Sequence, residues 1–89
     1  MVKYLSLRLT MASISDYTAC FCDVFDVQPD VAPTLKYQSI DAWDSVGHMS
    51  LMSQLEDTFE ILLDMDDIID FSSYEKGIEL LQKYSVDFS

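Results

Sequence analysis

The stretch "SIDAWDSVGHMSLMSQLEDTFEI", residues 39–61, begins as a loop and continues with the period of a helix. Its apolar residues recur every three or four positions: Val46, Met49, Met52, Leu55 and Phe59, followed by Leu62 just beyond. That spacing predicts a long amphipathic helix whose apolar stripe faces a core. We expect its methionines to fill that core rather than to line a cofactor pocket. Asp44 or Ser45 stands where the helix begins, and either side chain can cap it.

Other helical segments flank this one. We expect a first helix that begins with Ser13 as its cap and ends near Asp26. Its apolar face comprises Ile14, Tyr17, Phe21 and Val24. Residues 64–71, "DMDDIIDF", predict a short helical turn or a packed loop. A capping box of Ser72 and Glu75 then begins a last helix, whose apolar residues are Tyr74, Ile78, Leu81 and Tyr84.

A long connection separates the first two helices. Pro29 and Pro33 exclude a continuous helix over residues 27–43. A loop of this length in so small a domain is more often functional than not. The pattern predicts an all-α fold, a small four-helix bundle with three main helices, one short helix and this long loop. Residues 13–89 form the single domain, and residues 1–12 are expected to be a weakly ordered extension.

The net charge of the chain indicates which classes of partner it can bind. The chain of 89 residues has 16 acidic and 5 basic side chains, a formal net charge of −11. Because that field repels phosphate, we expect no nucleic-acid partner and no binding to anionic membranes, but a basic protein partner. No apolar run is long enough to insert in a membrane. Cys20 and Cys22 are interpreted as free thiols in a reducing compartment, and we expect a cytoplasmic protein. We also expect a monomer.

Two more specific functions, calcium binding and hydrolysis, are not supported by the residues. Asp64, Asp66, Asp70 and Glu75 fit positions of a calcium-binding loop, but Ile69 replaces its required glycine, so no metal site is expected. Ser45 and His48, three apart, resemble part of a hydrolase site, but a bundle this small has little room for the remaining groups. We therefore expect no catalytic residues and no enzymatic activity.

Ser45 itself has two interpretations. A helix N-terminus offers free N–H groups and a positive dipole end, so a phosphate ester on Ser45 would be favoured there. A plain helix cap explains the same residue more simply. The residues alone leave both open and favour the cap.

The segment "WDSVGHMSLMSQLEDTFEI" resembles the signature of acyl carrier proteins and the related peptidyl and aminoacyl carriers. In this family an Asp-Ser-hydrophobic triplet opens the second helix, here Asp44, Ser45 and Val46. A pattern of the form "LE..F.I" closes it, here beginning at Leu55. The order of the elements over residues 13–84 is similar as well. The sequence departs from the fatty-acid carriers at Trp43, Val46 and the pair Gly47–His48, which is more typical of stand-alone carriers in specialised pathways.

The resemblance implies a function without catalysis. Ser45 would receive 4′-phosphopantetheine from coenzyme A through a phosphopantetheinyl transferase, with Asp44 assisting the modification. The thiol of the arm would carry acyl or aminoacyl groups as thioesters and present them to partner enzymes. These partners would be acyl or aminoacyl ligases, acyltransferases and condensing enzymes.

The partner surface is predicted from charge. Residues 41–75 contain ten acids and no lysine or arginine. Such a belt suits basic docking surfaces, and we favour this interpretation over the alternative that the acids only keep a small protein soluble. The expected partner face comprises Val46, Glu56, Asp57 and Glu60. The alternative function is a non-covalent acidic adaptor that has the bundle but no prosthetic group.

Overall fold

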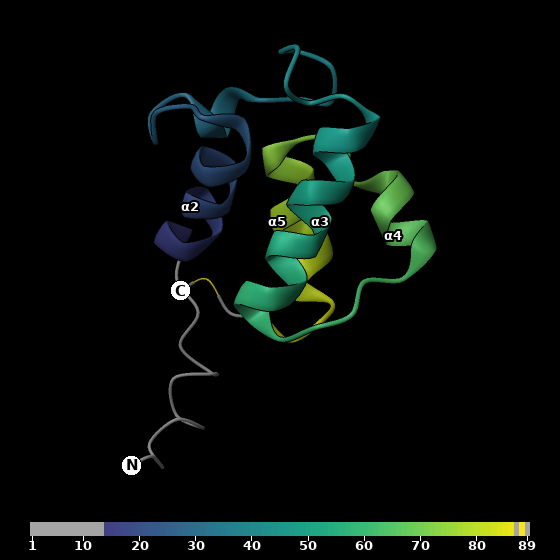
Figure 1. Ribbon diagram of the computed structural model, residues 1–89. Helices are drawn as coiled ribbons and strands as arrows, with labels where there is room; N and C mark the ends of the chain where they lie inside the picture. The colour runs from purple at the N-terminus through teal and green to yellow at the C-terminus, as the bar shows by residue number, and fades with distance from the viewer. Residues whose placement is uncertain (1–13, 87, 89) are drawn as a thin grey trace.

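The computed structural model describes residues 14–86 and residue 88. Its elements are α2 (Ile14–Phe25), the 3₁₀ turn η1 (Ala32–Thr34), α3 (Ser45–Phe59), α4 (Met65–Asp70) and α5 (Tyr74–Gln82). In the view of Figure 1, α3 and α5 occupy the middle, with α2 on one side and the short α4 on the other. Within the described residues there are four α-helices and no strand, which confirms the prediction of a small helical bundle. The expected extension, residues 1–12, and the expected cap Ser13 lie outside the described residues.

Aromatic side chains dominate the core. From α2 come Tyr17, Phe21 and Phe25, all buried, as predicted for the first two. The ring of Phe21 packs edge-on against Trp43, with centroids 5.6 Å apart. Ile14 was expected on the same face but is 39% exposed. It lies on the same face as Phe21, but it is the first residue of α2, so the end of the helix leaves it partly uncovered.

The core face of α3 differs from the prediction. Leu51, Met52 and Leu55 are buried, whereas Val46 is 76% exposed and Met49 52% exposed. Each step of three residues falls about 60° short of a turn, so two such steps put Val46 about 120° from Met52. The helix also ends earlier, because Glu60 adopts a left-handed conformation (φ 57°, ψ 50°). Leu62 therefore lies beyond the helix and is 82% exposed.

The long loop before α3 is packed against the bundle. Ala32, Leu35 and Trp43 are buried in it. A bridge between Lys36 and Ser73 joins the loop to the start of α5. There, the Tyr37 N–H donates to the Ser72 carbonyl at 2.9 Å. The loop is thus held at a fixed position beside the segment that connects α4 and α5.

The last two helices are joined by polar contacts. The N-cap of α5 is Ser73, whose hydroxyl accepts from the Lys76 N–H at 2.9 Å, so the predicted cap at Ser72 was one residue early. The bridge to Lys36 fixes the backbone of Ser73 in the extended conformation that a cap requires. On α4, the Asp67 carboxylate is nearly buried and accepts from Lys83 Nζ at 2.6 Å and from the Tyr84 hydroxyl.

A glycine permits close packing of α5. A Cβ on buried Gly77 would lie 2.1 Å from both the Phe71 ring and the Tyr17 hydroxyl. Tyr17 donates to the Tyr74 carbonyl at 2.6 Å, and burial raises its pKa.

The two cysteines are free thiols, as predicted. Cys20 is buried, its thiol donates to Thr58 Oγ1 at 3.4 Å, and burial raises its pKa. Cys22 is half-buried. None of the helices in the described ranges is long and apolar enough to cross a membrane.

Candidate functional site

The start of α3 is built by Asp44. This residue is extended (φ −104°, ψ −167°), and its Oδ1 accepts from the Gly47 N–H at 2.8 Å. Its carbonyl accepts from the His48 N–H at 2.8 Å. Asp44 is therefore the cap, and Ser45 is the first residue of the helix. Because capping does not use it, the exposed Ser45 hydroxyl is available for chemistry.

Gly47 brings the preceding loop close to this helix start. A Cβ at this position would lie only 2.0 Å from the Ala42 carbonyl oxygen. Backbone cannot rotate away as a flexible side chain can, so only glycine fits without displacing the loop. From the sequence, Gly47 was noted only as a departure from a family pattern, and its steric role could not be read there.

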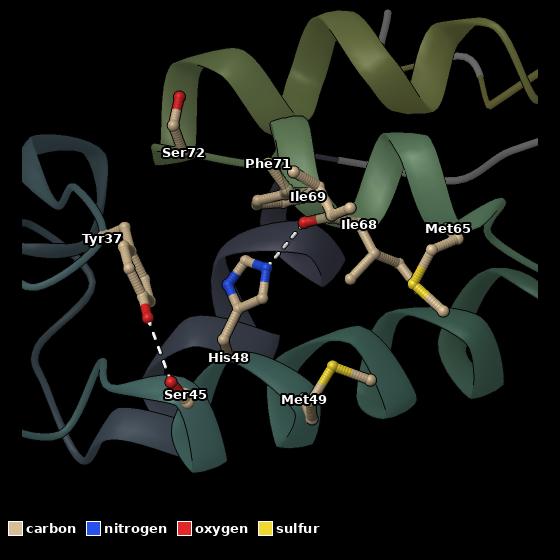
Figure 2. A pocket seen from close by; sticks show the side chains of 9 residues that line it. All are labelled: Tyr37, Ser45, His48, Met49, Met65, Ile68, Ile69, Phe71 and Ser72. Carbon is tan, nitrogen blue, oxygen red and sulfur yellow. Dashed lines mark hydrogen bonds between the residues drawn. The ribbon is translucent and has the colours of Figure 1, made fainter.

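Tyr37, which the sequence indicated only as an apolar residue of the long loop, contacts Ser45. The Tyr37 hydroxyl and Ser45 Oγ are 3.2 Å apart and share a hydrogen bond in which either can donate. Figure 2 shows the phenol extending from the loop toward Ser45. The eight-residue separation has no helical or strand period. The only sequence signal was the unusual length of the loop.

His48 connects α3 to α4. Trp43 Nε1–H donates to His48 Nδ1 at 2.9 Å. Since Nδ1 accepts, the proton of the neutral ring is on Nε2, which donates to the Ile68 carbonyl at 2.7 Å (Figure 2). Both ring nitrogens are thereby engaged, and neither is directed at Ser45. The histidine acts as a bridge between two helices and the buried Trp43.

A groove lies between α3 and α4 beside Ser45, and we call it the α3–α4 groove. Its volume is about 390 Å³. It is lined by Tyr37, Ser45, His48, Met49, Met65, Ile68, Ile69, Phe71 and Ser72. In Figure 2 the hydroxyls of Tyr37 and Ser45 lie at one end, and the thioethers of Met49 and Met65 lie toward the other. The groove therefore has a polar end at Ser45 and an apolar interior.

The rim of this groove exposes apolar side chains. Met65 and Ile69, one turn apart on α4, are 67% and 71% exposed. Met49 faces them from α3 and is half-exposed. Together with Val46 they form an apolar surface around Ser45, which the sequence analysis had assigned in part to the core.

The predicted partner residues divide into two groups. Val46, Asp57 and Glu60 are exposed. Eleven residues separate Val46 from Asp57, about three turns, so both lie on one face of α3 about 17 Å apart along its axis. Glu56 instead has an intramolecular role, because its half-buried carboxylate accepts from the Leu63 N–H at 2.9 Å. It stabilises the turn after α3.

The acidic belt is not uniform either. The hydrogen bond from Lys83, with a second from Tyr84, holds the pKa of Asp67 below its usual range. Asp67 is thus compensated internally, whereas Asp64, Asp66 and Asp70 around it are exposed. Nowhere in residues 14–86 or at residue 88 do three potential metal-ligating side chains converge to hold an ion.

Comparison of the chain with protein-family models, with curated proteins and with solved structures finds no match in any of the three.

Proposed function

We propose that this chain is a stand-alone acyl carrier protein, with an acyl-carrier-like bundle, and that Ser45 is the attachment site of a 4′-phosphopantetheine arm. The observation that carries the proposal is the position of the Ser45 hydroxyl. It is exposed, it is not used for capping, and it stands at one end of the α3–α4 groove. A serine with only a capping role would accept a backbone N–H, and here Asp44 does so.

The residues around Ser45 fit the group. The first N–H groups of a helix have no intrahelical acceptor, and the helix dipole favours an anion beside them. A phosphodiester on Ser45 would lie in this favourable field. The apolar walls of the groove, among them Met49 and Ile68, suit the uncharged part of an arm or its cargo.

Attachment requires an activated Ser45. The Oγ atom would form a bond to the phosphorus of coenzyme A that bears pantetheine. The bond from this phosphorus to the bridging oxygen of the pyrophosphate would break, adenosine 3′,5′-bisphosphate would leave with that oxygen, and the Ser45 proton would pass to a base of the transferase. Asp44 would assist, because one carboxylate oxygen caps α3 while the other can face a divalent ion in the transferase site.

The bound arm supplies a thiol that holds acyl or aminoacyl groups as thioesters. The protein holds the attachment point rigidly, and tethering raises the concentration of cargo at each partner's active site. The two free thiols, Cys20 and Cys22, suit a reducing compartment, so we place the carrier in the cytoplasm.

Docking would use the face of α3 that bears Ser45. Val46 supplies an apolar contact next to the attachment site, and Asp57 and Glu60 supply negative charge toward the far end. Basic surfaces on the transferase, on ligases and on acyltransferases or condensing enzymes would complement this face. Glu56 would support it indirectly by holding the turn after α3.

A non-covalent acidic adaptor is the second candidate. The exposed apolar side chains of Met65 and Ile69, within an acidic surface, favour it because they suffice for binding a basic partner. Incubation with coenzyme A, magnesium and a broad-specificity phosphopantetheinyl transferase separates the two. A carrier gains the mass of one phosphopantetheinyl group and a reactive thiol that can be acylated to a thioester. An adaptor gains neither.

A further inference from the structure

The contact between the Tyr37 and Ser45 hydroxyls is not part of the cap of α3, which Asp44 supplies. Tyr37 is 37% exposed, and its hydroxyl caps no helix. The hydroxyl nevertheless lies 3.2 Å from Ser45 Oγ. Of the groove-lining side chains in the described part of the chain, Tyr37 is the one with a hydrogen bond to Ser45.

The position of this phenol is fixed by its surroundings. The Tyr37 N–H is bonded to the Ser72 carbonyl at 2.9 Å. The ring packs edge-on against His48 and Trp43, with centroids 5.4 and 6.5 Å apart. A hydroxyl held by backbone and by two rings loses little freedom when it binds a ligand, which favours a directed hydrogen bond.

We propose that Tyr37 is a positioning residue for the arm, whose hydroxyl passes from Ser45 Oγ to the phosphate of the attached group and directs the arm into the α3–α4 groove. The inference depends on the proposed function. Once Ser45 is esterified it has no proton to donate, and its ester oxygen is a weak acceptor. The charged oxygens on the same phosphorus are stronger acceptors for a phenol.

Other polar groups of the groove cannot take this role in the same way. Both nitrogens of His48 are already bonded, to Trp43 and to Ile68. Ser72 lines the groove but makes no hydrogen bond to Ser45, and in Figure 2 it lies across the groove from that residue. Tyr37 stands beside Ser45, so a phosphate held there starts the arm at the groove. Without that bond the arm is equally free to extend along the exposed face of α3 past Val46 and Ser50.

The test compares three modified proteins: wild type, Tyr37→Phe and Ser72→Ala. Tyr37→Phe keeps the ring and removes the hydroxyl, and Ser72→Ala removes a hydroxyl that lines the same groove. Each is converted to completion by the transferase, checked by intact mass, and its phosphorus NMR spectrum is recorded. Amide NMR shifts of Met49 and Ile69, compared before and after modification, report whether the arm occupies the groove.

We expect the phosphodiester resonance to shift and sharpen in Tyr37→Phe, and the population of arm in the groove to fall about tenfold. Ser72→Ala should match wild type in both measurements. Thermal melts of the unmodified proteins should agree within a few degrees, because both hydroxyls are at the surface.

Each contrary result is distinct. If wild type gains no mass, the proposed function fails, and the role of Tyr37 fails with it. If all three proteins are modified and Tyr37→Phe has the wild-type phosphorus spectrum and groove shifts, the role of Tyr37 is wrong and the carrier function stands. Equal changes in Tyr37→Phe and Ser72→Ala would also overturn the proposed role of Tyr37, since they would indicate a general disturbance of the groove.

Discussion

Replacing His48 by alanine should destabilise the protein more than its half-buried position suggests. The imidazole is the acceptor for the indole N–H of Trp43, which is fully buried. After the substitution this donor has no partner within the protein. The same change removes the link from α3 to α4 through the Ile68 carbonyl. The perturbation therefore tests how the groove beside Ser45 is held together.

The magnitude follows from the separate contributions. An unsatisfied buried donor costs about 1–3 kcal/mol. Loss of the ring contacts with Tyr37 and Phe71, at centroid distances of 5.4 and 6.2 Å, adds about 1 kcal/mol. The Ile68 carbonyl is half-buried and can recruit water at small cost. The expected loss is about 2–4 kcal/mol, equivalent to roughly 10–30 °C in Tm for a domain of this size.

Urea unfolding followed by fluorescence measures this directly, because Trp43 is the only tryptophan in the chain. His48→Asn is the matched variant, since its side-chain oxygen can accept from Trp43 but its amide cannot reach as far as imidazole toward Ile68. It should recover about half of the loss. Ser50→Ala, exposed on the same helix, should stay within about 0.5 kcal/mol of wild type. A loss below about 0.5 kcal/mol for His48→Ala would refute the reasoning.

Three further predictions concern charge and capping. Asp44→Ala removes the cap of α3 and should lower the free energy of unfolding by about 1 kcal/mol in urea titrations. Because the Lys83 contact lowers the pKa of Asp67, the stabilisation from this carboxylate is complete above the unfolded-state pKa of about 4. This stabilisation is lost as the pH falls through the folded-state pKa of Asp67. The Asp67→Asn substitution should therefore flatten the acidic limb of a plot of stability against pH. Reversing Asp57 and Glu60 to lysine should lower the transferase kcat/KM severalfold at low salt and little at high salt.

Specific results would contradict each of these. An Asp44→Ala protein as stable as wild type would show that the hydrogen bond to Gly47 contributes nothing. Parallel acidic limbs for wild type and Asp67→Asn would show that the contact with Lys83 is not the cause of the pH dependence. Equal kcat/KM values at low salt for wild type and the double reversal, with helical circular dichroism unchanged in both, would leave docking to other residues.

The sequence predicted the order of the helices because periodicity and capping are local signals. It assigned Met49 to the core, and it placed Val46 both on the core stripe and on the partner face, because a three-residue spacing satisfies a helical pattern over short distances. Whether such a stripe is covered depends on where a neighbouring helix packs, and α4 leaves these two side chains exposed. The cap of α5 was displaced by one residue because Ser72 and Ser73 are equivalent in sequence, and only the bridge to Lys36 distinguishes them.

The candidate site was predicted in part. The position of Ser45 at the start of α3 followed from the sequence, and so did the exposure of Asp57. The Tyr37 contact did not, since it arises from pairing of Lys36 with Ser73, 37 positions along the chain. The bridging role of His48 was also missed, because its two partners, Trp43 and the Ile68 carbonyl, lie outside the turns of α3. Contacts of this kind depend on tertiary packing, for which one sequence has no periodic signature.

The most direct test of the central claim is the intact mass of three proteins after incubation with coenzyme A, magnesium and a broad-specificity phosphopantetheinyl transferase. These are wild type, Ser45→Ala and Ser53→Ala, the last removing an exposed serine on the same helix. Because Asp44 caps α3, Ser45→Ala should keep the helical circular-dichroism signal and lose less than about 0.5 kcal/mol of stability. Wild type and Ser53→Ala should each gain one phosphopantetheinyl group, and Ser45→Ala should gain none. Modification of Ser45→Ala, or no modification of folded wild type, would contradict the account.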